Sequence, residues 1–185
     1  MKKGGTGGAN TRTGLAFESK VDLVDLLKRK AGYAVKAIHY GDNANGTENV
    51  FEVLYKGETK AHLFKKHGFY KFLAAKGVDW RKHIARQLVP DSGVYVIADG
   101  TLFIIEMKTQ HTEGTVDEKL QTCGFKLRQY RRLVSELGLK VEYRYLLSDW
   151  FRQDKYRDVL EYIRETGCDY CFLPIDLGKL GLAFS

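Results

Sequence analysis

The chain has 185 residues, of which 30 are Lys or Arg and 23 are Asp or Glu, so its formal charge is +7 at pH 7. Apolar residues make up 44% of the chain without any low-complexity tract, which indicates one folded domain and excludes wholesale disorder. No apolar run reaches the roughly 18 residues of a membrane helix, and no signal-peptide core stands near the first residue. We therefore expect a cytoplasmic protein with acidic partners.

The three cysteines, Cys123, Cys168 and Cys171, are too few and odd in number for a disulfide framework. Cys168 and Cys171 have the C-x-x-C spacing of zinc and redox sites, but a zinc site needs four ligands and the chain has no second pair. Cys123 and a histidine are conceivable further ligands. Buried apolar thiols are the favoured interpretation.

The basic residues are clustered, several of them beside aromatic residues. The clusters are Lys28-Arg29-Lys30, Lys65-Lys66-His67, Arg81-Lys82-His83 and Arg128 with Arg131-Arg132. Each one alone is typical of a solvated face, but together they favour nucleic acid as the partner.

The first half of the chain predicts an arm, a helix and two strands. Residues 1–13 are too rich in glycine for regular structure and read as a flexible arm. Apolar residues recur at helical spacing over 15–31, and Gly32 ends that pattern. Residues 33–40 and 49–55 are short and rich in Val, Ile, Tyr and Phe, which predicts two strands.

Two further segments lead to the centre of the chain. Residues 61–88 are mixed in pattern and predict a helical segment in two pieces, broken near Gly77. Residues 61–87, basic and aromatic, are expected to form an insertion that contacts DNA. Residues 94–98 and 101–108 flank Asp99-Gly100, a strong signal for a β-hairpin.

The second half predicts helices alternating with strands. Thr115 and Glu118 match a capping box, followed by one long amphipathic helix that Gly138 ends. A strand over 140–147, a helix over 155–166 and a strand over 170–173 follow.

The alternation predicts an α/β fold. We expect a single domain with a central mixed β-sheet flanked by helices, in which 14–60 and 88–185 form the core and a helical insertion lies between them.

The predicted hairpin contains the charged residues that are candidates for catalysis. If Asp99-Gly100 is a two-residue turn, Asp91 lies opposite Lys108, and Glu106 projects on the same face. An ordinary cross-strand ion pair would explain these charges. However, they end the apolar run 102–105, where unpartnered charges would cost several kcal/mol. Two carboxylates can hold a hard divalent cation, which activates water and neutralises a phosphate, while the lysine stabilises the nucleophile.

Pro90-Asp91 followed by Glu106-x-Lys108 resembles the motif of the PD-(D/E)XK nuclease superfamily. The block from Glu106 to Thr122 is similar to small type II restriction endonucleases, and the likeness covers about residues 88–132. It implies a restriction-endonuclease-like core in a prokaryotic protein, Mg²⁺ bound by Asp91 and Glu106, and Lys108 as the catalytic lysine. By the same likeness, Glu18 on the first helix would reach the metal; its alternative is a solvent-facing residue in a helix's first turn.

Other polar residues are candidates for contacts with DNA. Gln110 shares the face of Lys108 if the strand continues, and Thr115 stands at a helix start, where phosphate binds readily. Lys119 and Lys126 form a polar stripe that would follow the DNA backbone; the alternative is a solvated helix face.

Three functions remain open from the sequence. The first is a Mg²⁺-dependent, sequence-specific endonuclease of the type II restriction class that cuts double-stranded DNA to 5′-phosphate ends, acting as a homodimer on a palindromic site. The second is a Holliday-junction resolvase or repair nuclease of the same superfamily. The third is a non-catalytic basic nucleic-acid-binding module. None of these requires an organic cofactor or a membrane.

Overall fold

A computed structural model describes residues 21–39, 48–110 and 116–184, apart from the side chain of Asp117. The predicted arm, Glu18 and Thr115 lie outside the described residues, and so do residues 15–20 of the helix predicted over 15–31. Among the residues described, no helix combines the length and the apolar character needed to cross a bilayer.

Within the described ranges, seven strands form one mixed sheet in which spatial order follows chain order. The strands are β1 (Tyr33–Ala37), β2 (Val50–Tyr55), β3 (Glu58–Lys65), β4 (Ser92–Val96), β5 (Thr101–Lys108), β6 (Lys140–Leu147) and β7 (Asp169–Phe172). Strands β1 to β5 pair antiparallel, and β5, β6 and β7 pair parallel through helical crossovers. The predicted α/β class with a central mixed sheet is confirmed.

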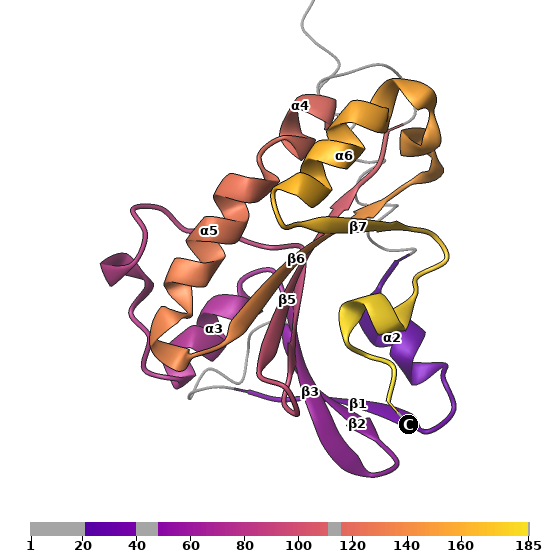
Figure 1. Cartoon of the computed structure of the whole chain (residues 1–185). Coiled ribbons are helices and arrows are strands. Elements are labelled where there is room, and N and C mark those ends of the chain that lie inside the picture. Colours follow the sequence, from indigo (N-terminus) through magenta and orange to yellow (C-terminus); the bar gives the residue numbers. More distant parts are fainter. Residues whose placement is uncertain (1–20, 40–47, 111–115, 185) are drawn as a thin grey trace, which may run out of the picture.

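Helices cover both faces of the sheet. The α-helices are α2 (Leu23–Lys28), α3 (Gly68–Ala75), α4 (Val116–Leu120), α5 (Cys123–Leu133) and α6 (Arg157–Glu165). Short 3₁₀ turns are η1 (Trp80–Lys82), η2 (Ser135–Leu137), η3 (Asp149–Arg152), η4 (Asp154–Tyr156) and η5 (Leu177–Leu180). Helices α3 and α5 lie on one side of the sheet, and α2 with the C-terminal segment lies on the other (Figure 1).

Successive side chains of β5 point alternately into two separate hydrophobic cores, so this strand is buried on both faces. Leu102 and Ile104 pack with α3, α5 and α6, whereas Phe103 and Ile105 pack with α2 and η5. A strand covered on both sides reads as a continuous apolar run, as 102–105 does.

The prediction of a helical insertion beginning at residue 61 is wrong. Residues 58–65 form β3, a strand inside the sheet between β2 and β4. Lys56 and Gly57 make the two-residue turn that starts it, because both have positive φ, at 50° and 87°, as a type I′ hairpin requires. Helix α3 follows and ends before Gly77, whose φ of 80° confirms the predicted break.

The predicted hairpin register is also wrong, by two residues. Val96, not Ala98, pairs with Thr101, so the turn spans 97–100. The side chain of Asp99 closes this turn by accepting a hydrogen bond from the Thr101 amide at 3.0 Å, and Gly100 takes φ 64°. Asp91 therefore does not lie opposite Lys108. A slip of two residues preserves the face of every side chain, so the predicted grouping survives the error.

The predicted long helix is two helices, because the chain turns at residues 121–122 between α4 and α5. The backbone carbonyls freed there have partners: the Tyr145 hydroxyl donates to Lys119 O at 3.2 Å and to Leu120 O at 3.3 Å, and the Thr122 hydroxyl donates to Lys119 O at 2.8 Å. Gly138, with φ 64°, ends the segment as predicted.

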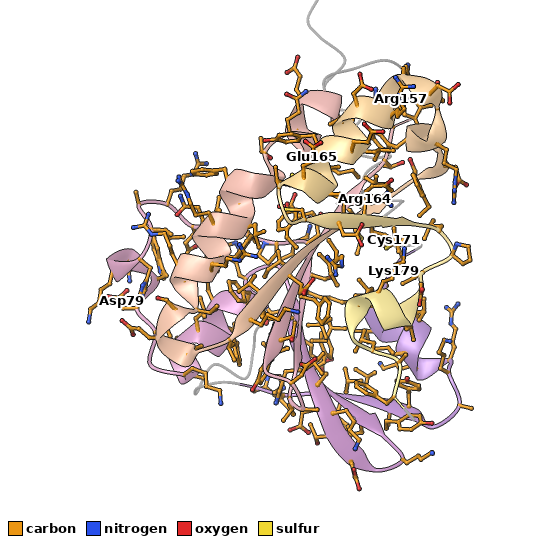
Figure 2. All side chains as sticks on the ribbon, viewed as in Figure 1. Asp79, Arg157, Arg164, Glu165, Cys171 and Lys179 are labelled. Carbon is orange, nitrogen blue, oxygen red and sulfur yellow. The ribbon has the colours of Figure 1, made fainter. Side chains whose placement is uncertain are left out.

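The C-x-x-C cysteines belong to different cores. Cys168 packs with the α5 side of the sheet, whereas Cys171, on β7, packs with the η5 side near Lys179 (Figure 2). All three cysteines are free and buried. The interpretation as buried thiols agrees with this arrangement.

Candidate active site

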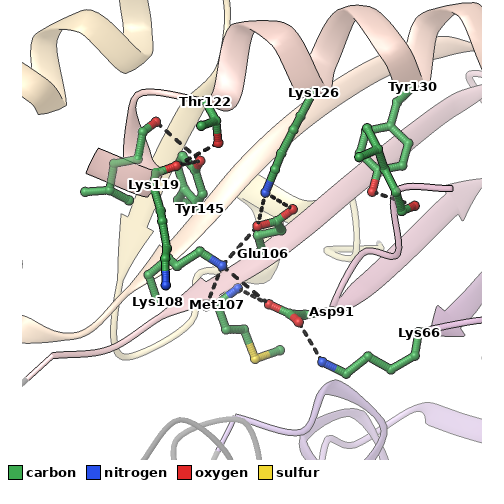
Figure 3. A network of polar contacts seen from close by, with 12 residues as sticks. Lys66, Asp91, Glu106, Met107, Lys108, Lys119, Thr122, Lys126, Tyr130 and Tyr145 are labelled. Atoms are coloured by element: carbon green, nitrogen blue, oxygen red, sulfur yellow. Dashed lines mark hydrogen bonds and ion pairs between the residues drawn. The ribbon is translucent and has the colours of Figure 1, made fainter. Parts of the chain in front are cut away.

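Three of the predicted residues meet at the carboxyl end of β5 (Figure 3). Nζ of Lys108 lies 3.0 Å from Oε2 of Glu106 and 4.0 Å from Oδ2 of Asp91. Those two oxygens can be no farther apart than the sum of these distances, about 7 Å. The two carboxylates and the ammonium therefore form one cluster.

Asp91 is held in place by the backbone and by a second lysine. The Met107 amide donates to Oδ2 of Asp91 at 2.8 Å, and Lys66 Nζ donates to Oδ1 at 2.6 Å. Lys66 follows directly after β3, so the strand that the sequence did not predict brings this charge to the site.

Lys126 reaches Glu106 from helix α5. Its Nζ donates to both carboxylate oxygens, at 2.7 Å and 2.8 Å, so it lies inside the cluster and not on a solvated helix face, the alternative that the sequence left open. The sequence signal for this contact is faint: Lys126 precedes Leu127 on the helix, one position from the buried face. A lysine beside a core position can turn its stem inward and keep its charge at a buried acid.

Burial and charge act in opposite directions on Glu106, whose side chain is 7% exposed. Burial alone would raise the pKa of the carboxyl, but the charges and hydrogen bonds of Lys108 and Lys126 outweigh it, so the pKa lies below its ordinary value. Glu106 is thus held as a carboxylate in a largely dry site.

Three tyrosines on the adjoining elements stay neutral. The pKa values of Tyr130, Tyr143 and Tyr145 are raised mainly by burial and, to a smaller extent, by the nearby charge of Glu106.

Oxygen atoms of the cluster surround the Lys108 ammonium. Three oxygens surround Nζ of Lys108, one each from Asp91, Glu106 and the Met107 carbonyl, the last at 3.2 Å. Carboxylate and carbonyl oxygens are ligands that Mg²⁺ accepts, with water and phosphate completing its shell. Across the described ranges, no group of three or more His, Cys, Asp or Glu side chains is placed to hold a metal ion. Two carboxylates and one carbonyl are therefore the donors offered here.

A groove of about 480 Å³ opens beside Glu106, between the segment 84–89 and helix α5. Lys126, Phe125 and Gln129 line it from the helix, so Glu106 and Lys126 of the cluster border an accessible concave surface.

The other predicted residues are less closely tied to this cluster. Gln110 is buried, and its Oε1 has no hydrogen-bond partner among the described residues. Lys119 is exposed on α4, and the contacts drawn for it in Figure 3 are those of its backbone carbonyl with the hydroxyls of Thr122 and Tyr145. Glu18 and Thr115 lie outside the described residues.

No protein-family model matches this chain, and a search of curated proteins finds no significant relative. The functional argument therefore depends on the chemistry of the site.

Proposed function

We propose that the chain is a Mg²⁺-dependent endonuclease of the type II restriction class that hydrolyses phosphodiester bonds in double-stranded DNA. One observation carries the proposal: Asp91, Glu106 and Lys108 converge at the end of a buried strand, beside an open groove. Their motif resembles that of the PD-(D/E)XK nucleases.

Each residue has a role that follows from its contacts. Asp91 and Glu106 would hold the metal, which when bound supplies an activated water and neutralises phosphate charge. Lys108 lies between the two carboxylates and is placed to stabilise the negative charge that develops on the phosphate. The Met107 amide and Lys126 hold the two carboxylates in position, so little reorganisation is needed.

The charge balance of the site supports a phosphate substrate. Three lysines, Lys66, Lys108 and Lys126, face two carboxylates. A surface that binds anions without catalysis has no use for two adjoining carboxylates, one of them buried, which makes the binding-module alternative the weaker one.

The test is cleavage of a mixed-sequence plasmid by the purified protein with Mg²⁺. We expect discrete bands with 5′-phosphate ends, and we expect Lys108→Ala and Asp91→Ala to bind DNA without cutting it. Lys140→Ala removes an equal charge from β6, where Lys140 is 68% exposed, and should cut like the wild type.

Other outcomes decide between the alternatives. A smear, or no cleavage with any divalent metal, would contradict the restriction proposal. Selective cutting of four-way junctions would favour a resolvase. Mapping the ends on a sequenced plasmid gives the site, its symmetry and hence whether a two-fold dimer is required.

A further inference from the structure

The groove beside Glu106 has features that the proposed chemistry does not use. Its volume of about 480 Å³ falls within the roughly 300–1,000 Å³ of ordinary ligand pockets. Apolar side chains of Ile84, Leu88 and Val89 line one wall, and Phe125, Lys126 and Gln129 line the other. Metal binding and phosphate hydrolysis need neither the apolar wall nor the aromatic ring.

The apolar wall is fixed in place by buried tyrosines. The hydroxyls of Tyr70 and Tyr130 both donate to the Leu88 carbonyl, at 2.9 Å and 3.1 Å, and the Leu88 amide donates to the Tyr70 oxygen at 2.8 Å. Burial raises the pKa of Tyr70 to about 12, so its hydroxyl keeps the proton that it donates. The groove is therefore preformed, which reduces the cost of ordering a ligand in it.

Phe125 stands exposed at the groove, although it is a large apolar residue on an otherwise well-packed helix. It is 54% exposed, and the guanidinium of Arg128 lies 5.8 Å from its ring centroid. An aromatic ring next to a cation is the combination on which nucleobases stack while their phosphates are neutralised.

Gln129 presents an unsatisfied acceptor in the same groove. Its Oε1 is buried and has no hydrogen-bond partner within the described part of the chain. Leaving a buried acceptor unpaired is costly, so a ligand that donates a hydrogen bond there gains affinity. The exocyclic amino groups of adenine and cytosine are such donors.

We propose that this groove binds an unpaired nucleobase of the DNA strand whose phosphate lies at Lys108. The base stacks on Phe125 between the walls and donates to Gln129, while Arg128 neutralises the adjoining phosphate. The inference rests on the proposed function in one respect, since that function places the phosphate at Lys108. It adds a substrate class: DNA with a base that is already unpaired or is extruded from the duplex.

The test measures DNA affinity when the Phe125 ring, the bases, or both are removed. All titrations contain a chelator so that no cleavage occurs. The probes are a short fluorescein-labelled oligodeoxyadenylate and an abasic strand of equal length, titrated with wild type and Phe125→Ala. We expect the substitution to weaken binding of the oligodeoxyadenylate by about fivefold to 150-fold, the range of aromatic stacking, and to leave binding of the abasic strand unchanged.

One variant serves as a matched control, and another tests the proposed acceptor. Tyr162→Ala removes another exposed aromatic residue, 40% exposed on α6, and should leave both affinities unchanged. Gln129→Leu keeps the approximate shape, removes the acceptor and should weaken oligodeoxyadenylate more than the abasic strand. Because Phe125 is exposed, its truncation should leave the thermal unfolding midpoint near that of the wild type.

The remaining outcomes separate this inference from the proposed function. Equal weakening of both strands by Phe125→Ala, or no weakening of either, overturns the nucleobase site even if the wild type cuts plasmid. A loss of affinity that Phe125→Ala causes only when bases are present, in a protein that cuts no DNA, supports the nucleobase site and contradicts the nuclease proposal. A matching loss on intact duplex identifies an extruded base, whereas a loss confined to the single strand identifies an unpaired one.

Discussion

Two glutamates of this protein are each held between two cations, on opposite faces of the sheet, and they differ instructively. Glu142 on β6 receives Lys140 and Arg144, each at 2.6 Å. Glu106 on β5 receives Lys126 at 2.7 Å and Lys108 at 3.0 Å. Judged by ion-pair distances alone, the two clusters are nearly equivalent.

Their surroundings are not equivalent. The Glu142 side chain is 20% exposed and Lys140 is 68% exposed, so water screens that cluster. The Glu106 side chain is 7% exposed, a second carboxylate from Asp91 adjoins it, and a groove opens beside it. A buried ion cluster contributes little net stability compared with apolar packing, so we infer that the Glu106 cluster serves chemistry and the Glu142 cluster serves solubility and local order.

The largest expected effect is on catalysis. Glu106→Gln removes a proposed metal ligand and should lower the single-turnover rate of plasmid cleavage by at least about 100-fold. Glu142→Gln makes the same chemical change on the other face and should leave the rate within about twofold of the wild type. Equal rates for the two variants would contradict the assignment of the site; circular dichroism of both variants checks that they fold.

The second effect is on stability. Lys126→Met keeps the aliphatic stem but removes a charge that buried Glu106 needs, and should lower the free energy of unfolding by about 1–3 kcal/mol. Lys140→Met should change it by no more than about 0.5 kcal/mol, because exposed ion pairs contribute little. Urea unfolding at neutral pH measures both. A loss for Lys140→Met as large as that for Lys126→Met would mean that burial does not distinguish the clusters.

The third effect is a pH dependence with a defined sign. The pKa of Glu106 is lower in the folded chain than its ordinary value of 4.5, so the charged form stabilises the fold. That contribution is fully present above the unfolded pKa and is lost as the pH falls through the folded pKa. The difference in unfolding free energy between wild type and Glu106→Gln should therefore shrink below about pH 4.5. A difference that stays constant or grows on acidification would refute the claim that the fold stabilises Glu106 in its charged form.

Elements with strong local signals were predictable from the sequence. Strand β6 spans Lys140–Leu147, as its alternation predicts, and Gly138 ends the preceding segment. Glu106 and Lys108 share a face because side chains two residues apart in a strand must do so, whatever the register. The prediction that the site residues share one face of the sheet therefore depended only on whether they stand an even number of residues apart. A register error of two residues does not change that.

Other features were missed, two because a local turn signal was misleading or weak, and one because it depends on a distant part of the chain. The side chain of Asp99 closes the hairpin turn and shifts its register, and the signal of the Lys56-Gly57 turn is weaker than that of Asp99-Gly100. The inward turn of Lys126 depends on Glu106, 20 positions earlier in the chain. Periodicity describes which face of a helix is apolar, but it does not say which acid a boundary lysine will meet.

The smallest expected effect sharpens the comparison between the clusters through salt. Raising NaCl from about 0.1 M to about 1 M shortens the screening length from about 10 Å to about 3 Å, which weakens solvent-exposed pairs more than buried ones. We expect the stability difference between wild type and Lys140→Met to vanish at high salt, while that for Lys126→Met keeps at least about four-fifths of its low-salt value. Because the comparison is between differences, the general effect of salt on the fold cancels. Parallel losses in the two series would show that water reaches Lys126 and Glu106 as freely as it reaches Lys140, and the dry, preorganised cluster on which the proposed chemistry depends would be refuted.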